Sequence, residues 1–199
     1  NLKINPGEKI IIDGENGSGK TTLIRVLSGL LHHTSGSLYI NDNTFNKIDV
    51  KQYRARIGSI IQGETTFEGT ILENITFNDK NISSEDLKWA LDAVQLTSYI
   101  KKLPKGLDTK IFPEGKELSS SNIQKILLAR SIIHKPTILF YEEPTDKMDT
   151  KVANEIIDFI TSETNKWTVV VSSQNPHWLT KCSREITMQK GTILSDIKI

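Results

Sequence analysis

A glycine-rich stretch near the start of the chain has the spacing of a phosphate-binding loop. Residues 14–21 read Gly-Glu-Asn-Gly-Ser-Gly-Lys-Thr, which matches the pattern G-x-x-x-x-G-K-[ST] in full. Glycines let the backbone wrap closely around phosphate oxygens, and the N-terminus of a following helix favours negative charge. Lys20 is expected to reach the β- and γ-phosphates, and Thr21 to offer its hydroxyl to Mg²⁺. The stretch therefore predicts a nucleotide-binding site.

Two acidic residues lie at the end of a second apolar run. Residues 138–141 read Ile-Leu-Phe-Tyr, which is typical of a buried strand, and Glu142 and Glu143 follow directly. Open α/β sheets bind ligands at the carboxyl ends of their strands, so both carboxylates are expected beside the glycine-rich loop. Glu142 is predicted to face the Mg²⁺ shell. Glu143 is predicted to orient or deprotonate a water molecule that attacks the γ-phosphate.

The elements that position these residues are predicted from apolar runs and their periods. Strands are indicated at residues 9–12, 37–40, 57–61, 137–141 and 168–172. Helical patterns follow the glycine-rich turn and cover residues 121–134 and 150–163, and two short runs at 185–188 and 192–194 predict a closing hairpin. This alternation predicts a mostly parallel α/β sheet with helices on both faces.

Residues 63–120 interrupt the alternation of strands and helices. The section has no run that indicates a strand. Ser83 and Asp86 form the pattern of a capping box ahead of an apolar helix face that includes Leu87, Ala90, Leu91 and Val94. We therefore predict a helical insertion within the α/β fold.

Composition excludes several classes of protein. The 199 residues carry 25 lysines and arginines against 24 aspartates and glutamates, and the net charge of +1 provides no broad basic surface for nucleic acid. The apolar runs are too short to span a bilayer. A single cysteine, Cys182, excludes an internal disulfide and suits a reducing compartment. Because the chain begins at Asn1 without a methionine, we expect it to be part of a longer protein.

Further motifs follow the loop in a specific order, and with them the chain resembles the nucleotide-binding domain of ATP-binding cassette (ABC) transporters along its whole length. Residues 14–22 resemble the Walker A motif, and Gln62 resembles the Q-loop. Residues 70–75 and 103–109 resemble segments of the exporter branch. The signature motif and its helix are matched by residues 119–122 and 129–131, and Walker B running into the D-loop by residues 143–145 and Asp149.

The resemblance implies a fold, partners and a location. The fold would be that of a P-loop NTPase, an ABC ATP-binding domain over residues 1–199 with a RecA-like core at 1–63 and 121–199 and a helical subdomain at 64–120. A second nucleotide-binding domain, identical to this one or different from it, would form a head-to-tail homo- or heterodimer. The dimer would sandwich two ATP molecules, each between the Walker motifs of one chain and the signature of the other. The helical subdomain that carries residues 70–77 would face a transmembrane domain at the cytoplasmic face of a membrane, and ATP hydrolysis would drive export.

The same resemblance assigns roles to individual residues. ATP contacts are implied for Walker A, at Gly14, Asn16, Gly17, Ser18, Gly19, Lys20, Thr21 and Thr22, and for the signature, at Ser119, Ser120 and Ser121. Mg²⁺ contacts are implied for Thr21, Gln62 and Glu142. Catalytic roles are implied for Glu143, Gln174 and Gln62.

The chain departs from the family pattern in its signature and in three other places. Where the family reads L-S-G-G-Q, residues 118–122 read Leu-Ser-Ser-Ser-Asn, and two Cβ atoms should crowd the contact with the opposing γ-phosphate. Glu142 stands where Walker B usually has aspartate, and Gln174, which cannot carry a proton, stands where a switch histidine is usual. Phe112 and Pro113 replace a usual glycine and acid. We therefore predict that ATP and Mg²⁺ bind while hydrolysis is slow.

Three other functions are considered because parts of the sequence resemble them or depart from the family pattern. In a regulatory or structural ABC module, ATP would clamp the dimer with little turnover, which the altered signature favours. A GTPase is suggested by residues 146–149, Asp-Lys-Met-Asp, which faintly resemble the guanine-reading N-K-x-D motif but follow Glu143 too soon to end a separate strand. A soluble ABC ATPase of translation or DNA maintenance is disfavoured by the near-neutral charge and by residues 70–75. Specificity for a transported substrate would lie in the transmembrane part.

Overall fold

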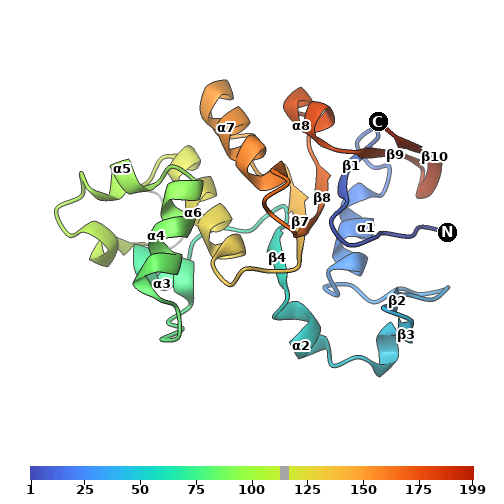
Figure 1. The fold of residues 1–199 in the computed structure, drawn as a ribbon, viewed down its shortest axis with the longest axis horizontal. Helices are drawn as coiled ribbons and strands as arrows, with labels where there is room; N and C mark the ends of the chain where they lie inside the picture. The colour runs from blue at the N-terminus through green and yellow to red at the C-terminus, as the bar shows by residue number, and fades with distance from the viewer. Residues whose placement is uncertain (113–116) are drawn as a thin grey trace.

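Six strands form one sheet at the centre of the molecule, in the order β10-β9-β1-β8-β7-β4 (Figure 1). The computed structural model describes residues 1–112 and 117–199. Neighbouring strands pair in parallel, except that β9 and β10 pair antiparallel as the predicted closing hairpin. The six strands are β1 (Lys9–Asp13), β4 (Ile57–Ile60), β7 (Ile138–Glu142), β8 (Thr168–Ser172), β9 (Arg184–Gln189) and β10 (Thr192–Lys198).

Helices cover both faces of this sheet, which confirms the predicted layering. Ile10 and Ile12 of β1 pack with Ile24 of α1 (Lys20–Leu27), whereas Ile11 packs on the opposite face. That face is covered by α6 (Ser120–Ile132), α7 (Thr150–Thr161) and α8 (Pro176–Lys181). Because both faces are buried, the middle residues of β1, β7 and β8 are continuous apolar runs, and β-branched residues suit them.

The helix α6 lies between the sheet and a group of shorter helices (Figure 1). It contacts β4 on one side and both α3 (Ile71–Thr76) and α4 (Ser84–Ala93) on the other, and α5 (Thr97–Ile100) packs on α4. Residues 126–129 of α6 are buried in succession, as expected of a helix with neighbours all round. In residues 1–112 and 117–199, no helix has the length and apolar character needed to cross a membrane.

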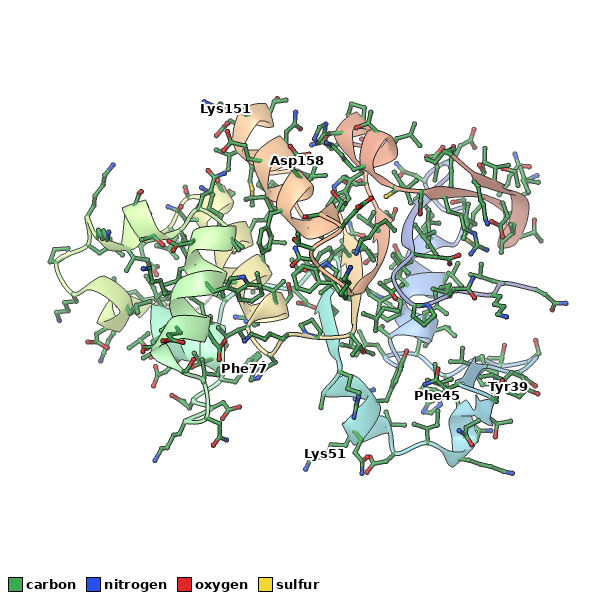
Figure 2. The ribbon with its side chains drawn as sticks, viewed as in Figure 1. Tyr39, Phe45, Lys51, Phe77, Lys151 and Asp158 are labelled. Atoms are coloured by element: carbon green, nitrogen blue, oxygen red, sulfur yellow. The ribbon has the colours of Figure 1, made fainter. Side chains whose placement is uncertain are left out.

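Two expectations about strands are corrected by the structure. The run at residues 37–40 forms only β2 (Tyr39–Ile40), which pairs with β3 (Asn43–Thr44) outside the main sheet, in the part where Tyr39 and Phe45 are labelled in Figure 2. The section predicted to lack strands contains β5 (Gly69–Thr70), which pairs antiparallel with β6 (Lys110–Ile111). Pairs of two-residue strands are too short to show the alternation by which a strand is recognised in a sequence.

The predicted capping box at Ser83 is formed only in part. Ser83 Oγ accepts a hydrogen bond from the backbone N–H of Asp86 at 3.0 Å, so the cap of α4 is present. The Asp86 carboxylate accepts from the Ser83 hydroxyl at 2.8 Å rather than from its backbone, because aspartate is one methylene shorter than the glutamate of a full box. A complete box starts α3, where Thr70 and Glu73 exchange bonds at 3.1 and 2.6 Å.

Candidate functional site

The carboxyl ends of the parallel strands open onto a cavity of about 790 Å³. Its walls come from the loop between β1 and α1, the segments after β4, β7 and β8, and the first turns of α6. Its size is typical of small-molecule sites, and it lies at the sheet edge where open α/β folds bind ligands. The residues singled out by the sequence that line it are Asn16, Gly17, Ser18, Gly19, Lys20, Thr21, Thr22, Gln62, Ser120, Glu142, Glu143 and Gln174.

The glycine-rich loop adopts a path that side chains would block. Gly14 has φ +141°, and a Cβ there would lie 2.2 Å from the carbonyl oxygen of Met188 on β9. Gly19, with φ +104°, is the N-cap of α1, and a Cβ there would lie 3.3 Å from Gly191 Cα. The loop therefore passes tightly over the β9–β10 hairpin and leads directly into α1, whose first N–H groups have no partners within the helix.

Two side chains of the loop fit a phosphate chain. Ser18 is 4% exposed, and its Oγ has no hydrogen-bond partner among the described residues. Lys20 Nζ donates to the carbonyl oxygens of Gly14 and Glu15, the second at 3.0 Å. A buried hydroxyl without a partner is costly, and an ammonium group can redirect its donors to stronger, charged acceptors. Both groups are therefore suited to phosphate oxygens at the cavity wall.

The residues predicted to hold Mg²⁺ come together at this cavity. Glu142 is buried, and its Oε2 accepts a hydrogen bond from the backbone N–H of Gln62 at 2.9 Å. The parallel register of β4 and β7 places Ile60 beside Tyr141, and so brings the residues that follow both strands together. Thr21 lines the same cavity. A hydroxyl, an amide carbonyl and a carboxylate are oxygen donors of the kind Mg²⁺ prefers, so these residues fit the ion.

Glu143 has an unusual backbone conformation. Its φ of +43° is left-handed, which is uncommon for a residue with a side chain. Its carboxylate accepts from Ser173 Oγ at 2.8 Å and from the backbone N–H of Gln174 at 2.9 and 3.1 Å. Its own N–H donates to the Ser172 carbonyl oxygen at 2.8 Å. Left-handed residues other than glycine cluster at functional sites, and here the conformation directs the carboxylate toward the turn after β8.

Gln174 and His177 lie in different surroundings. Gln174 is an exposed residue at the cavity wall, and its backbone N–H contacts Glu143. His177 Nε2 lies 2.8 Å from Oδ1 of Asp158, which belongs to α7 and is labelled in Figure 2. Lys181 also bonds to Asp158 at 2.8 Å, and the two bonds, that from Lys181 first, keep the pKa of Asp158 below its usual value. His177 therefore joins α7 to α8.

The three serines of the signature region occupy the start of α6. Ser119 caps the helix, its Oγ accepting from the backbone N–H of Asn122 at 3.2 Å. Ser120 lines the cavity, whereas Ser119 and Ser121 lie outside its lining, as does Gly14. Phe112 and Pro113 stand where the family usually has a glycine and an acid. Phe112 is exposed, and Pro113 lies outside the described residues.

The acidic end of the segment that resembles a guanine-reading motif has a local structural role. Asp149 Oδ1 accepts from the backbone N–H of Val152 at 3.1 Å, so this residue caps α7. Asp146 and Lys147 line the cavity beside Glu143. The motif therefore lies in the loop that joins β7 to α7, not at the end of a further strand.

Three residues at the site were not predicted from the sequence. Gln124 of α6 lines the cavity, and Ser173 holds the Glu143 carboxylate. Glu64 also lines the cavity, and its Oε1 accepts from Ile61 N–H at 3.2 Å. Desolvation at the cavity wall, and then the charge of Glu142, raise the pKa of Glu64. The available signal was closeness in sequence, since Glu64 follows Gln62 by two residues and Ser173 precedes Gln174.

This fold and this site define a P-loop nucleotide-binding α/β domain. A narrower assignment comes from comparison with known families. The family model described as ABC transporter matches residues 1–146, and the chain belongs to that family.

Individual relatives point to the exporter branch of the family. The ATP-dependent permease MDL1 of Candida albicans is 32% identical over 203 residues, covering 100% of this chain and 30% of the permease. The probable microcin-H47 secretion/processing ATP-binding protein MchF of Escherichia coli is 35% identical over 151 residues, which cover 76% of this chain and 22% of MchF. The chain thus spans less than a third of the length of these two relatives.

A solved structure shares the fold. It is described as a bacterial Atm1-family ABC exporter with ATP bound, and it superposes with a TM-score of 0.92 over 99% of this chain and 34% of that chain. The sequence identity is 22%, so the likeness concerns the fold. The fold is that of the nucleotide-binding domain of an ABC exporter, as the sequence predicted.

Proposed function

We propose that this chain is the motor domain of an ABC exporter, which binds and hydrolyses ATP to drive transport across a membrane. The observation that carries the proposal is the single cavity that brings Lys20 of the glycine-rich loop together with Glu142 and Glu143. Membership of the ABC transporter family supports ATP as the nucleotide. Because the relatives are much longer, a transmembrane domain is the proposed partner, and the cytoplasmic face of a membrane the proposed location.

Nucleotide binding is assigned to the glycine-rich loop. Lys20 would exchange the carbonyl oxygens of Gly14 and Glu15 for β- and γ-phosphate oxygens, and Ser18 Oγ would gain a partner. Thr21, Gln62 and Glu142 would hold Mg²⁺, which neutralises phosphate charge when it is bound. The phosphates would thus be aligned beside the end of β7.

Glu143 is the proposed general base. Its carboxylate would take a proton from a water molecule while the water oxygen bonds to the γ-phosphorus. The bond from that phosphorus to the bridging oxygen breaks, and ADP leaves with the electron pair. Ser173 and the backbone of Gln174 orient the carboxylate. The Gln174 side chain would donate a hydrogen bond to the γ-phosphate, but unlike a histidine it could not take up or release a proton in the reaction.

A head-to-tail dimer with a second nucleotide-binding domain would complete two such sites. The hydroxyls of residues 119–121 and the N-terminus of α6 are proposed to face the ATP of the partner domain. The Cβ atoms of Ser120 and Ser121 would hold that contact at a longer distance than glycine does, so we propose slow turnover. In this arrangement residues 1–63 and 121–199 form the ATP-binding core, and residues 64–120 form a helical subdomain that faces the transmembrane domain.

The proposal is tested by Mg²⁺-dependent ATP turnover of the chain and of Glu143→Gln. We expect turnover to fall about 100-fold or more, the usual contribution of a positioned general base, with ATP affinity unchanged within about twofold. Glu85→Gln is the matched control, since Glu85 is an exposed glutamate in the first turn of α4. Equal rates for the chain and Glu143→Gln would remove Glu143 from the mechanism.

A regulatory or structural module is a second candidate, favoured by the serines at 120 and 121. In that case ATP would join two domains without phosphate release. Sedimentation and phosphate release, measured together in the chain and in the double variant Ser120→Gly/Ser121→Gly, separate the two functions. A motor slowed by its signature should turn over several-fold faster with glycines, whereas a clamp should dimerise with ATP in both forms and release no phosphate.

A further inference from the structure

Gln124 on α6 is a buried polar residue that the proposed reaction does not use. It is 8% exposed, and its side-chain amide is fully engaged. Nε2 donates to the Glu143 carbonyl oxygen at 2.9 Å and to Asp146 Oδ1, while Oε1 accepts from the backbone N–H of Lys147 at 2.9 Å. Both amide hydrogens and the carbonyl oxygen are thus directed to one segment, residues 143–147.

That segment begins with the proposed general base. The peptide group before Glu143 is tied to β8, because its N–H donates to the Ser172 carbonyl oxygen at 2.8 Å. The peptide group after Glu143 is tied to α6, because its carbonyl oxygen accepts from Gln124. Between these two hydrogen bonds the backbone of Glu143 is left-handed. Residues other than glycine keep this conformation only where the surrounding structure enforces it.

We propose that Gln124 is a positioning residue that holds the backbone of Glu143 so that its carboxylate stays at the cavity wall, bonded to the turn after β8. The inference rests on the proposed function, in which Glu143 is the base. Without the Gln124 amide, residues 143–147 would lose three hydrogen bonds to α6. One of them is the bond to the carbonyl oxygen of Glu143. Displacements of about 1 Å in a reacting group can cost about 100-fold in rate, so this loss should appear in turnover.

Gln124 also connects the base to the serines at the start of α6. It lies five residues after Ser119, the N-cap, and therefore little more than one helical turn away. The turn proposed to meet the ATP of the partner domain and the tie to Glu143 thus belong to the same short stretch of helix. A shift of α6 during dimer closure would be passed to Glu143 through the Gln124 amide.

A matched control comes from Ser131 on the same helix. Its hydroxyl is buried, donates to the Leu128 carbonyl oxygen, and lies 2.7 Å from Tyr141 Oη on β7. Ser131→Ala therefore removes a buried contact between α6 and the strand that leads to Glu142, but leaves residues 143–147 bonded as before. A role of Gln124 in stability alone would affect both variants alike.

The test compares the chain with Gln124→Met, Gln124→Glu and Ser131→Ala. We measure kcat and KM for Mg-ATP, ATP affinity without Mg²⁺, thermal unfolding, and amide hydrogen exchange of Lys147 without nucleotide. Gln124→Met should lower kcat at least tenfold with KM and affinity within twofold, and Lys147 should exchange at least tenfold faster. Gln124→Glu keeps an acceptor for Lys147 but cannot donate to Glu143, so kcat should fall while Lys147 stays protected. Ser131→Ala should keep kcat within twofold.

The outcomes separate this proposal from the proposed function. A kcat within twofold of the parent in both Gln124 variants overturns the positioning role, as does an equal fall in Ser131→Ala. If the methionine variant does not fold, the glutamate variant, which keeps the size of the side chain, decides in the same way. If the parent chain binds ATP but releases no phosphate, the proposed function fails. In that case the hydrogen exchange of Lys147 alone tests whether Gln124 holds residues 143–147. An unchanged exchange rate in Gln124→Met would show that it does not.

Discussion

The two ends of the central sheet use polar side chains in opposite ways. At the carboxyl ends of the strands, Ser18 Oγ has no partner in the described part of the chain, and Lys20 reaches only carbonyl oxygens of its own loop within that part. At the amino ends, Lys9 Nζ donates to the carbonyl oxygens of Asn165 and Trp167. Arg184 contacts two carboxylates there, each within 3 Å.

The difference indicates which end serves a ligand and which end closes the fold. Both ends belong to the same buried strands, so burial alone does not distinguish them. What differs is that the carboxyl ends leave a cavity and the unpartnered Ser18 hydroxyl, while at the amino ends Lys9 and Arg184 bond to distant parts of the fold. Substitutions of side chains at the carboxyl ends should therefore reduce ligand binding, and those at the amino ends should reduce stability.

Gly14 is an expected exception, because it lies at the ligand-binding end of the sheet but has a structural role. An alanine there would place its Cβ 2.2 Å from the Met188 carbonyl oxygen at φ +141°. Overpacking and backbone strain together predict a loss of about 3 to 5 kcal/mol in the free energy of unfolding of Gly14→Ala. Urea denaturation measures this loss.

Gly36→Ala is the control for Gly14→Ala. Gly36 also has a positive φ, +81°, but no atom in residues 1–112 and 117–199 lies within 4 Å of its Cβ position. Strain alone should cost about 1 kcal/mol there. Equal losses in the two variants would show that the close approach to Met188 is unimportant.

Lys20→Met should weaken ATP binding and leave the stability of the fold nearly unchanged. Methionine keeps the apolar stem but cannot form the charged hydrogen bonds to phosphate, each about 1.5 to 3 kcal/mol, so ATP affinity should fall about 100-fold. Stability should change by less than about 0.5 kcal/mol, because the bonds of Lys20 are to carbonyls of its own loop. Calorimetric titration with ATP and denaturation check both statements.

Lys151→Met is the control for this loss of a positive charge. Lys151 is exposed on α7 and is labelled in Figure 2. Its replacement should leave ATP affinity within about twofold. If Lys20→Met and Lys151→Met both lost much of their ATP affinity, the cause would be the overall charge of the chain rather than a contact of Lys20.

The sequence was sufficient where chemistry is encoded in adjacent residues. The glycine-rich loop is recognisable because its glycines, Lys20 and Thr21 are covalently contiguous and their spacing is fixed by the loop geometry. The strands that carry it were recognisable because both faces are buried, which produces runs such as Ile10–Ile12 and Val169–Val171. These two signals predicted the sheet and its ligand-binding edge.

Contacts between distant residues could not be predicted in this way. Gln124 is one of several polar residues in α6, and its partners lie 19 to 23 positions further along the chain. No periodic pattern marks such a residue, and glutamine is acceptable in a helix for other reasons. The left-handed backbone of Glu143 likewise depends on Ser172 and Gln124, not on its own residue type. The fold was therefore more predictable than the positioning of the base.

Arg184→Met tests the amino end of the sheet. The Arg184 side chain is 12% exposed and forms a two-pronged contact with Asp196 at 2.6 and 2.7 Å and a bond to Glu8 at 2.9 Å. Its hydrogen bonds hold the pKa of Asp196 below its usual value. Leaving two carboxylates without this partner should cost about 2 kcal/mol of stability and leave ATP affinity unchanged. Lys198→Met, an exposed change on β10, is the control and should cost less than about 0.5 kcal/mol.

Lys9 gives the smallest and most specific test, through pH. Its burial lowers the pKa of the Lys9 ammonium to about 8, and the nearby positive charge of Lys166 lowers it further. Burial raises the pKa of the Cys182 thiol to about 12, so that group stays protonated in this range. Between about pH 8 and the usual lysine value the unfolded chain holds one more proton at this site, so the contribution of Lys9 to stability rises with pH.

Lys9→Gln, which keeps donors for the backbone carbonyls but does not titrate, isolates this effect. The stability of the parent chain minus that of Lys9→Gln should increase by about 1 kcal/mol from about pH 7.5 to about pH 9. Denaturation curves at the two pH values measure the difference. A difference that stays constant, or falls, would mean that the Lys9 ammonium is stabilised by its two carbonyl acceptors more than burial disfavours it. The Lys9 ammonium would then remain charged without a loss of stability. The difference between the amino ends of the strands and the ligand-binding end would in that case depend on Arg184 alone.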